Sequence, residues 1–211
     1  MAPLLNAIVD LSHHNTVDSF EEARADGIIA VIHKATEGTT FVDAKYAERR
    51  ARAKAAGLLW GAYHFGVKGS VDEQVSHFLG NANAGDSDLL VLDFEPNPRE
   101  GTMTLSEAET FVQALREETG RQPALYSGQA FLRERLGTRL DSPLSDCLLW
   151  IARYSVQLPD PPKAFKRFDI WQYTDGSAGL QPHQVTGIGR CDRDKFNGDE
   201  AELRGVWGVS T

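Results

Sequence analysis

The 211-residue chain has little cysteine and no long apolar run. Its two cysteines, Cys147 and Cys191, lie far apart and adjoin apolar segments, so we expect buried thiols, with a disulfide left open. No apolar run approaches the roughly 20 residues that span a bilayer, so we expect no membrane partner. The first nine residues lack a basic region and meet Asp10 early, which indicates a buried strand rather than a signal peptide.

Basic residues are in deficit as well. The chain has 22 Lys and Arg against 30 Asp and Glu, a formal net charge of −8, and a pI near 5.2. Proteins that bind nucleic acid usually present a basic surface, so nucleic acid is a poor candidate partner. Hydrophobic residues at 41% and charged residues at 25% are ordinary for a folded globular protein. The length favours a single domain over residues 1–211, and a monomer is the default expectation.

Apolar runs of strand length alternate with segments of helical periodicity. The clearest helix is predicted over residues 105–119, where Thr104 and Glu107 form a capping-box pattern and Gly120 follows as a C-cap. Two further helices are predicted over 41–56 and 71–79. Strands are predicted over 7–11, 28–32, 58–65, 89–94, 123–126, 148–152 and 168–173.

This alternation predicts an α/β fold with a parallel sheet and crossover helices. Seven or eight strands favour a TIM-like (β/α) barrel. Because a full eightfold barrel usually needs about 250 residues, we expect a compressed barrel with some helices missing. An open doubly wound sheet is the alternative, although no glycine-rich nucleotide-binding motif follows the first strand.

Carboxylates close several of the predicted strands. Asp10 follows Ala-Ile-Val in the first strand, Asp93 and Glu95 close the fourth, and Asp192 follows Cys191 near the last predicted strand. Functional residues of a parallel barrel lie where strands end and loops begin. Carboxylates buried at such positions are costly to desolvate, which makes these residues candidates for a functional site.

Asp93 and Glu95 form the sharpest of these patterns. Strand alternation places both side chains on one face, about 7 Å apart at the backbone. Mutual repulsion then raises the pKa of one of the two carboxyls, which leaves a proton donor beside a carboxylate. General acid cleavage of a glycosidic bond requires this pair of groups. The plainer interpretation is a solvated strand end, or an ion pair with Lys34, which follows the second strand.

Aromatic residues gather near the same strand ends. Flat sugar faces pack on aromatic rings, and Tyr63, Tyr126 and Tyr154 are the best candidates because a phenol at a strand mouth keeps its hydroxyl hydrated. Any single aromatic residue is more often part of the core. His13 and His14 could hold a metal, but adjacent histidines usually point apart, so no metal or other cofactor is predicted.

These residues belong to an ordered set of motifs that resembles the glycoside hydrolase family 25 lysozymes, the Chalaropsis-type muramidases. The matching stretches cover nearly the whole chain, and the ordered set is far more specific than any one of them. They are IVDLSH (8–13), KATEG (34–38), FVD (41–43), GLLWGAYHF (57–65), LVLDFE (90–95), WIARY (150–154), IWQYT (170–174) and residues 185–196 with Asp192.

The resemblance implies a flattened, irregular barrel that cleaves the β-1,4 bond from N-acetylmuramic acid to N-acetylglucosamine in peptidoglycan. Glu95 matches the family's general acid and Asp93 its partner, while Asp10 and Asp192 match two further cleft aspartates. The positions that the resemblance places along the sugar cleft are Lys34, Tyr63, Tyr126, Trp150, Tyr154 and Gln172.

Two mechanisms stay open at this point. Either the substrate's acetamido carbonyl attacks the anomeric carbon with support from Asp93, which we favour, or water activated by Asp10 or Asp192 attacks directly with inversion. The acidic chain without a signal peptide fits an endolysin that is made in the cytoplasm and released by another protein. The alternative is a secreted enzyme whose signal sequence is absent from this sequence. A glycan-binding barrel without activity and a metal-dependent deacetylase are the alternative functions.

Overall fold

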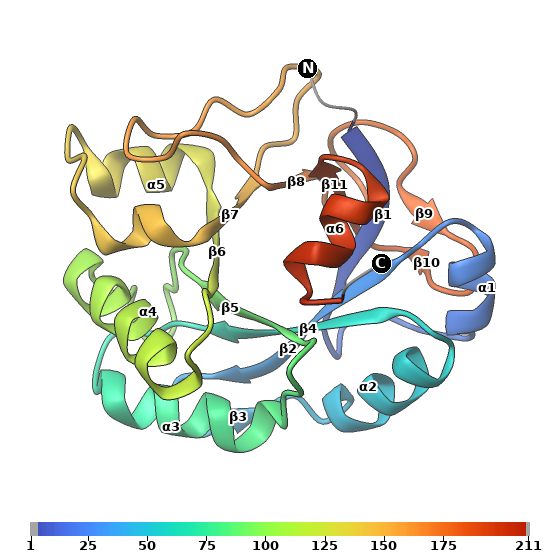
Figure 1. Ribbon diagram of the computed structural model, residues 1–211, viewed down its shortest axis with the longest axis horizontal. Helices are drawn as coiled ribbons and strands as arrows, with labels where there is room; N and C mark the ends of the chain where they lie inside the picture. Colours follow the sequence, from blue (N-terminus) through green and yellow to red (C-terminus); the bar gives the residue numbers. More distant parts are fainter. Residues whose placement is uncertain (1–3, 210–211) are drawn as a thin grey trace.

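The computed structural model describes residues 4–209, and within them eight strands close into a barrel (Figure 1). Seven of these strands pair in parallel, and the eighth, β11, is inserted antiparallel between β8 and β1. The barrel strands are β1 (Leu4–Leu11), β2 (Ala30–Glu37), β4 (Leu59–Phe65), β5 (Leu89–Asp93), β6 (Ala124–Gly128), β7 (Leu148–Ala152), β8 (Ile170–Thr174) and β11 (Asp192–Asn197).

Helices follow the first five parallel strands. Of the predicted helices, α4 (Leu105–Thr119) has the predicted bounds, its Thr104–Glu107 capping box and a left-handed Gly120 at its end. The helix predicted over 71–79 extends further, as α3 (Val71–Ala82). Three short helices were not predicted from the sequence: α1 (Phe20–Ala25), α5 (Gln129–Leu136) and α6 (Glu200–Val206).

The helix predicted over 41–56 is wrong in its first turn. Phe41–Val42 forms the short strand β3, which pairs antiparallel with Thr36 and Glu37, and the helix α2 covers Tyr46–Ala55. Both β3 residues are exposed at the edge of the sheet, where backbone pairing with β2 outweighs the helical pattern of the side chains.

Two of the crossover connections lack a regular α-helix. The chain between β7 and β8 has none, and the chain between β8 and β11 has only a hairpin of β9 (Gln184–Val185) and β10 (Gly189–Arg190). A short 3-10 helix, Pro143–Asp146, precedes β7. The compressed, irregular barrel is therefore confirmed, and the closed order of strands is not that of an open doubly wound sheet.

The barrel holds two hydrophobic layers. One fills its interior and includes Ile8, Val91 and Ile170, with Leu203 and Trp207 closing the end near the C-terminus. The Trp207 indole N–H donates to the Trp60 carbonyl at 2.8 Å and anchors this closure. The second layer packs the outer face of the sheet against the helices and includes Phe78, Phe94 and Phe111.

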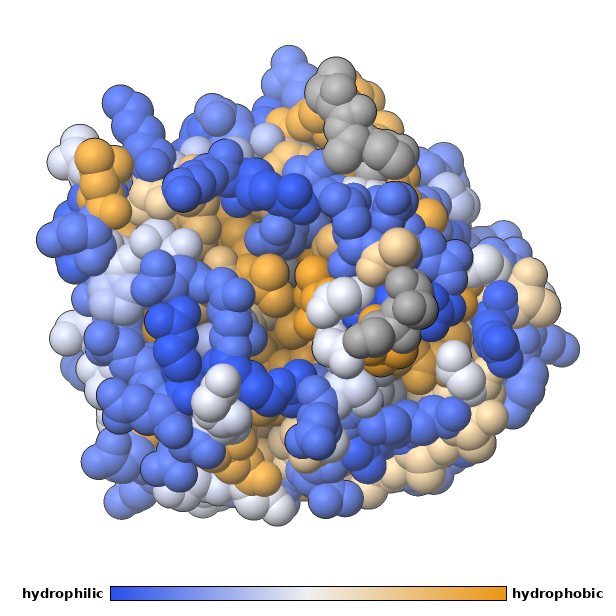
Figure 2. Space-filling model, in the orientation of Figure 1, coloured by the Kyte–Doolittle hydropathy of each residue, from blue (hydrophilic) through white to orange (hydrophobic). Residues whose placement is uncertain are grey.

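Across residues 4–209, no helix combines the length and apolar character needed to cross a bilayer. The face shown in Figure 2 is predominantly hydrophilic, with hydrophobic residues exposed in its hollowed middle.

Candidate active site

The candidate site is one further layer of the barrel interior. Side chains of a strand alternate between its two faces, so residues two positions apart share a face. Val91 faces the hydrophobic interior and Asp93 therefore does as well, and Ile170 and Gln172 are related in the same way. The register pairs Asp93 with Tyr126, and Tyr126 with Trp150. Apolar residues fill the lower levels, and polar residues fill the level at the carboxyl ends of the parallel strands.

This polar layer forms a cavity of about 230 Å³. Nine of the ten residues predicted from the sequence line it, although they come from seven different strands and the segments after them. The lining residues are Asp10, Tyr63, Asp93, Glu95, Tyr126, Trp150, Tyr154, Gln172 and Asp192.

Glu95 has the protonation of a general acid. Burial raises its pKa to about 7, the charges of Asp192 and Glu37 act in the same direction, and Lys34 opposes them. A carboxyl with this pKa is half protonated at neutral pH and donates a proton to a leaving group.

Asp93 lies beside Glu95 and is buried, with 5% of its surface exposed. Burial, and then the charge of Glu95, raise its pKa well above the usual range, and one of its oxygens, Oδ1, is buried with no hydrogen-bond partner among residues 4–209. A buried polar atom without a protein partner, at the wall of a cavity, is available to a ligand. Phe94 points to the outer layer, as alternation requires.

Lys34 is the one predicted residue outside the cavity lining. Its ammonium pairs with the Glu37 carboxylate, whose other oxygen accepts a 2.9 Å hydrogen bond from the Asn97 amide. The simple ion pair between Lys34 and the Asp93–Glu95 pair is therefore not formed. Lys34 still acts on both carboxyls through its charge, which lowers their pKa values.

Gln172 connects the two sides of the cavity. Its side-chain oxygen accepts hydrogen bonds from the hydroxyls of Tyr126 at 2.8 Å and Tyr154 at 2.7 Å. Its amide nitrogen donates to Asp10 at 2.9 Å. Because all three contacts use the amide in one orientation, Gln172 fixes the two phenols and one carboxylate relative to one another.

Asp194 belongs to the site but was not predicted from the sequence. Alternation along β11 turns Asp194 inward with Asp192, and it is fully buried. One oxygen accepts the Trp150 indole N–H at 2.7 Å, and the other, Oδ2, is buried with no hydrogen-bond partner within residues 4–209. Burial raises the pKa of Asp194 to about 8 and that of Asp192 to about 6. The Asp-x-Asp spacing, Asp192 and Asp194, is the signal that could have identified it.

Asp10 lies between these two aspartates. Burial and the charges of Asp192 and Asp194 raise the pKa of Asp10 well above its usual range. When one of these carboxyls is protonated, it can share its proton with Asp10, so the three titrate as a group. Within this group Asp194, with a pKa of about 8, is mostly protonated at neutral pH.

Other aromatic residues of the barrel strands belong to the core. Trp60, Trp171 and Tyr173 are at most 1% exposed, as the sequence pattern allowed. Trp150 is also buried, although it lines the cavity. Tyr154, at 41% exposed, lies at the open side of the cavity.

The described residues contain no group of three or more His, Cys, Asp and Glu side chains arranged to hold a metal. His13 instead bonds Asp43, with 3.0 Å between Nδ1 and Oδ2. Cys147 and Cys191 are buried and unpaired with each other, and burial raises the pKa of both thiols to about 12, so neither is an activated nucleophile.

Comparison with known proteins agrees with this geometry. The family model "Glycosyl hydrolases family 25" matches residues 9–179. Lysozyme M1 of Streptomyces globisporus is 28% identical over an alignment of 210 residues, which covers 92% of this chain and 69% of that protein. The uncharacterized protein YegX of Escherichia coli O6:H1 is 32% identical over 176 residues, 82% of this chain and 60% of its own length.

Solved structures give the same result. The family GH25 lysozyme from Aspergillus fumigatus has a TM-score of 0.81 at 31% identity, covering 99% of this chain and 100% of that one. The CTP1L endolysin has a TM-score of 0.72 at 26% identity, covering 95% of this chain and 69% of that one. With the family model matching most of its length, the chain belongs to glycosyl hydrolase family 25 and is a glycoside hydrolase.

Proposed function

We propose that this protein is a muramidase that hydrolyses the β-1,4 bond from N-acetylmuramic acid to N-acetylglucosamine in bacterial peptidoglycan. The observation that carries the proposal is a half-buried Glu95 with a pKa of about 7, next to Asp93, in a small cavity lined by carboxylates and phenols. Membership of a family whose named relatives are lysozymes and muramidases supports the same substrate.

In this proposal Glu95 is the general acid. Its proton passes to the departing glycosidic oxygen as the bond breaks, which leaves Glu95 ionised. Asp192 and Glu37 favour the protonated form before the step, while Lys34 stabilises the carboxylate that the step produces. The pKa of Glu95 is therefore balanced close to neutrality, where proton transfer is effective in both directions.

Asp93 acts on the substrate's own nucleophile. Its Oδ1, which has no partner among residues 4–209, accepts the N–H of the 2-acetamido group and turns the acetamido oxygen towards the anomeric carbon. That oxygen attacks as the glycosidic bond breaks, and water then opens the cyclic intermediate with retention of configuration. In the competing route, Asp10 or Asp192 activates water for direct attack, and the product has inverted configuration.

Sugar contacts are assigned to the walls of the cavity. Tyr126 and Tyr154, held by Gln172, border the space beside the carboxyls, and Tyr63 and Trp150 contribute ring edges. Lys34 lies outside the cavity lining but close enough for its charge to lower the pKa values of Asp93 and Glu95, and we assign it a contact with bound glycan.

The substrate places the protein's action at the bacterial cell wall. Likeness to the CTP1L endolysin supports a lysin that is made in the cytoplasm and reaches the wall after release. We propose that it works as a monomer on peptidoglycan strands, without a metal or other cofactor.

Product analysis on purified peptidoglycan tests this function. After digestion and borohydride reduction, mass spectrometry should detect reduced muramic acid at the new chain ends. Reduced glucosamine ends would show a glycosidase of another bond specificity. If no new ends form, the protein is instead a glycan-binding protein or a deacetylase. Release of acetate that stops when a chelator is added would identify the deacetylase.

The Glu95→Gln variant tests the assigned acid. It should lose at least about 100-fold in rate, the usual contribution of general acid catalysis, and still bind insoluble peptidoglycan. Lysis at the parent's rate would refute the role of Glu95. Proton NMR of the first product anomer separates the two routes, because retention supports the acetamido mechanism and inversion supports direct attack by water.

A further inference from the structure

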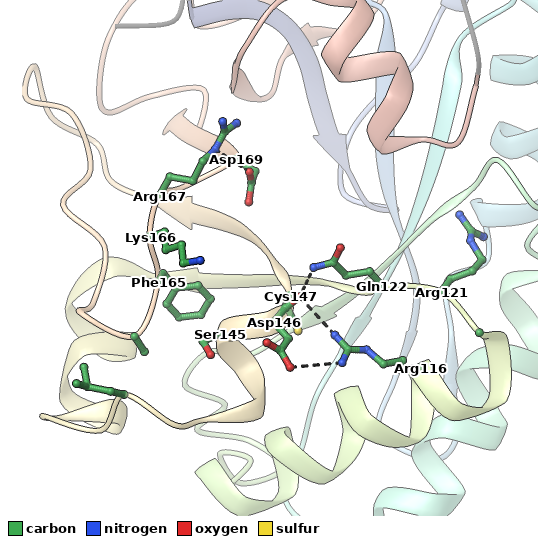
Figure 3. A pocket seen from close by; sticks show the side chains of 13 residues that line it. Arg116, Arg121, Gln122, Ser145, Asp146, Cys147, Phe165, Lys166, Arg167 and Asp169 are labelled. Carbon is green, nitrogen blue, oxygen red and sulfur yellow. Dashed lines mark hydrogen bonds and ion pairs between the residues drawn. The ribbon is translucent and has the colours of Figure 1, made fainter.

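A second and larger cavity, of about 780 Å³, lies at the opposite end of the barrel from the site (Figure 3). It is formed by the end of α4 and by the segments that lead into β6, β7 and β8. Those segments precede the parallel strands, whereas the candidate active site lies where the strands finish. A molecule bound in the second cavity would therefore leave the first one free.

Positive charge predominates in this second cavity, which we call the basic groove. Four basic side chains line it against two carboxylates, those of Asp146 and Asp169. This local excess contrasts with the net charge of −8 of the chain. The four basic residues come from three separate segments, and they are Arg116, Arg121, Lys166 and Arg167.

Much of this charge is not neutralised within the protein. Lys166 makes no hydrogen bond or ion pair with any residue between 4 and 209. Arg121 donates to the Gly85 carbonyl at 3.1 Å rather than to a carboxylate. Arg116 reaches Asp146 at 3.4 Å, and both side chains stay open to solvent. Arg167 has a closer partner, Asp169, at 3.0 Å.

We infer that the basic groove binds a linear polymer of the cell wall through its phosphate groups. Three of the four cations are arginines, whose planar guanidinium groups match phosphate oxygens in pairs. The cations are spread along an open cavity that a single phosphate would fill only in part, so a chain with repeated phosphates makes more contacts. The wall as the source of this polymer rests on the proposed function.

Such a groove answers an electrostatic problem. An acidic protein is repelled by an anionic wall, and this repulsion slows its approach. A cluster on one face in which cations outnumber carboxylates turns that repulsion into a local attraction. It holds the molecule with its opposite end, which carries the catalytic cavity, facing away from the polymer.

The double substitution Arg116→Gln with Lys166→Gln tests the groove. Neither side chain makes a hydrogen bond shorter than 3.4 Å to residues 4–209, so folding should be unaffected. The probe is inorganic polyphosphate, with binding measured by calorimetry at low and moderate salt. We expect the groove variant to bind about tenfold more weakly, and the difference to shrink as salt increases.

The matched control, Lys45→Gln with Lys68→Gln, removes two charges from exposed lysines outside the groove.

Three results would overturn the inference. The first is equal affinity of parent and groove variant for polyphosphate, and the second is an equal loss in the control variant. The third is equally tight binding of poly-L-glutamate, which would show that the groove does not select phosphate.

Cell walls with and without their phosphate polymers extend the test to the natural setting. The parent should sediment more with untreated walls, and the groove variant should lose that advantage; no advantage for the parent would reject the wall polymer as the ligand. Release of reducing ends from stripped walls reports the proposed function separately. Its absence in the parent would reject the muramidase and leave the polyphosphate result standing.

Discussion

At the scale of single residues, protonation controls this molecule. The cavity gathers carboxyls whose pKa values are raised, chiefly by burial, and Glu95 has a value of about 7. A different neighbour acts on each carboxyl. Lys34 lowers the pKa of Glu95, Gln172 donates a hydrogen bond to Asp10, and the Trp150 indole donates one to Asp194.

The pH dependence of hydrolysis follows from Glu95. A general acid works only while protonated, so kcat/KM should fall as pH rises through about 7, approaching a tenfold loss per pH unit above it. The measurement is kcat/KM between pH 5 and 9 on soluble glycan, with circular dichroism as a control for folding. A rate that stays level up to pH 9 would contradict Glu95 as the acid.

Asp194 is predicted to be a positioning residue. Asp194→Asn keeps an oxygen for the Trp150 indole and places an N–H donor towards Asp10, so it should retain at least about a tenth of the parent's kcat/KM. Asp194→Leu, of similar volume, leaves the indole N–H without an acceptor and should lose about 100-fold. If both variants lose activity equally while folded, the hydrogen bonds of Asp194 do not position the site.

At the scale of elements, local sequence signals decide where helices begin, and strand pairing decides the rest. Helix α4 has a complete capping box, in which Thr104 Oγ1 accepts from the Glu107 N–H at 3.2 Å and the Glu107 carboxylate accepts from the Thr104 N–H at 2.7 Å. Helix α2 has no side-chain cap, and its start was predicted wrongly.

Thr104→Ala should therefore destabilise the protein by about 1 kcal/mol, because one cap acceptor is removed. The control is Thr110→Ala in the same helix, also exposed, whose hydroxyl bonds only the Ser106 carbonyl. Replacement by the better helix former should leave stability unchanged or slightly higher. Urea unfolding of the three proteins measures both effects, and equal stabilities would show that the cap contributes nothing.

At the scale of the whole molecule, closure of the barrel concentrates negative charge. The register pairs Asp10 with Asp192 across β1 and β11, and Gln172 with Asp194 across β8 and β11. Closure therefore buries carboxylates that the unfolded chain would leave in water, and folding stability depends on pH as a result.

Stability should decline between about pH 6.5 and 8.5. In this range the folded protein keeps protons on groups such as Glu95 and Asp194, with pKa values of about 7 and 8, that the unfolded chain has already lost. Each such proton costs up to about 1.4 kcal/mol per pH unit. Below pH 6.5 the buried His33 and His64 have the opposite effect on stability. Burial lowers their pKa values to about 4, so the unfolded chain binds these protons first and stability falls as the pH falls.

Urea unfolding at pH 6.5 and 8.5 measures this decline, which we expect to be about 1–3 kcal/mol in the parent. The Asp194→Asn variant, which has no proton to lose there, should decline less. Equal or higher stability of the parent at pH 8.5 would contradict the raised pKa values.

Much of this protein was predictable from its sequence because the relevant signals are local. Strand runs ending in Asp10, Asp93 and Glu95 depend on neighbours only a few positions away, and alternation alone places Asp93 and Glu95 on one face. The ordered motifs then indicated the family and nine of the residues that line the cavity.

The tertiary structure decided what depends on distant partners. β3 forms because Phe41 and Val42 pair with β2, and Asp194 joins the site because β11 closes the barrel between β8 and β1. Lys34 bonds Glu37 rather than the Asp93–Glu95 pair, because the fold brings the Glu37 carboxylate to its ammonium. The basic groove arises from segments between residues 116 and 169 that meet only once three strands are aligned. Sequence periodicity reports the environment of each residue along its own strand, whereas burial and charge at a site are sums over the whole folded chain.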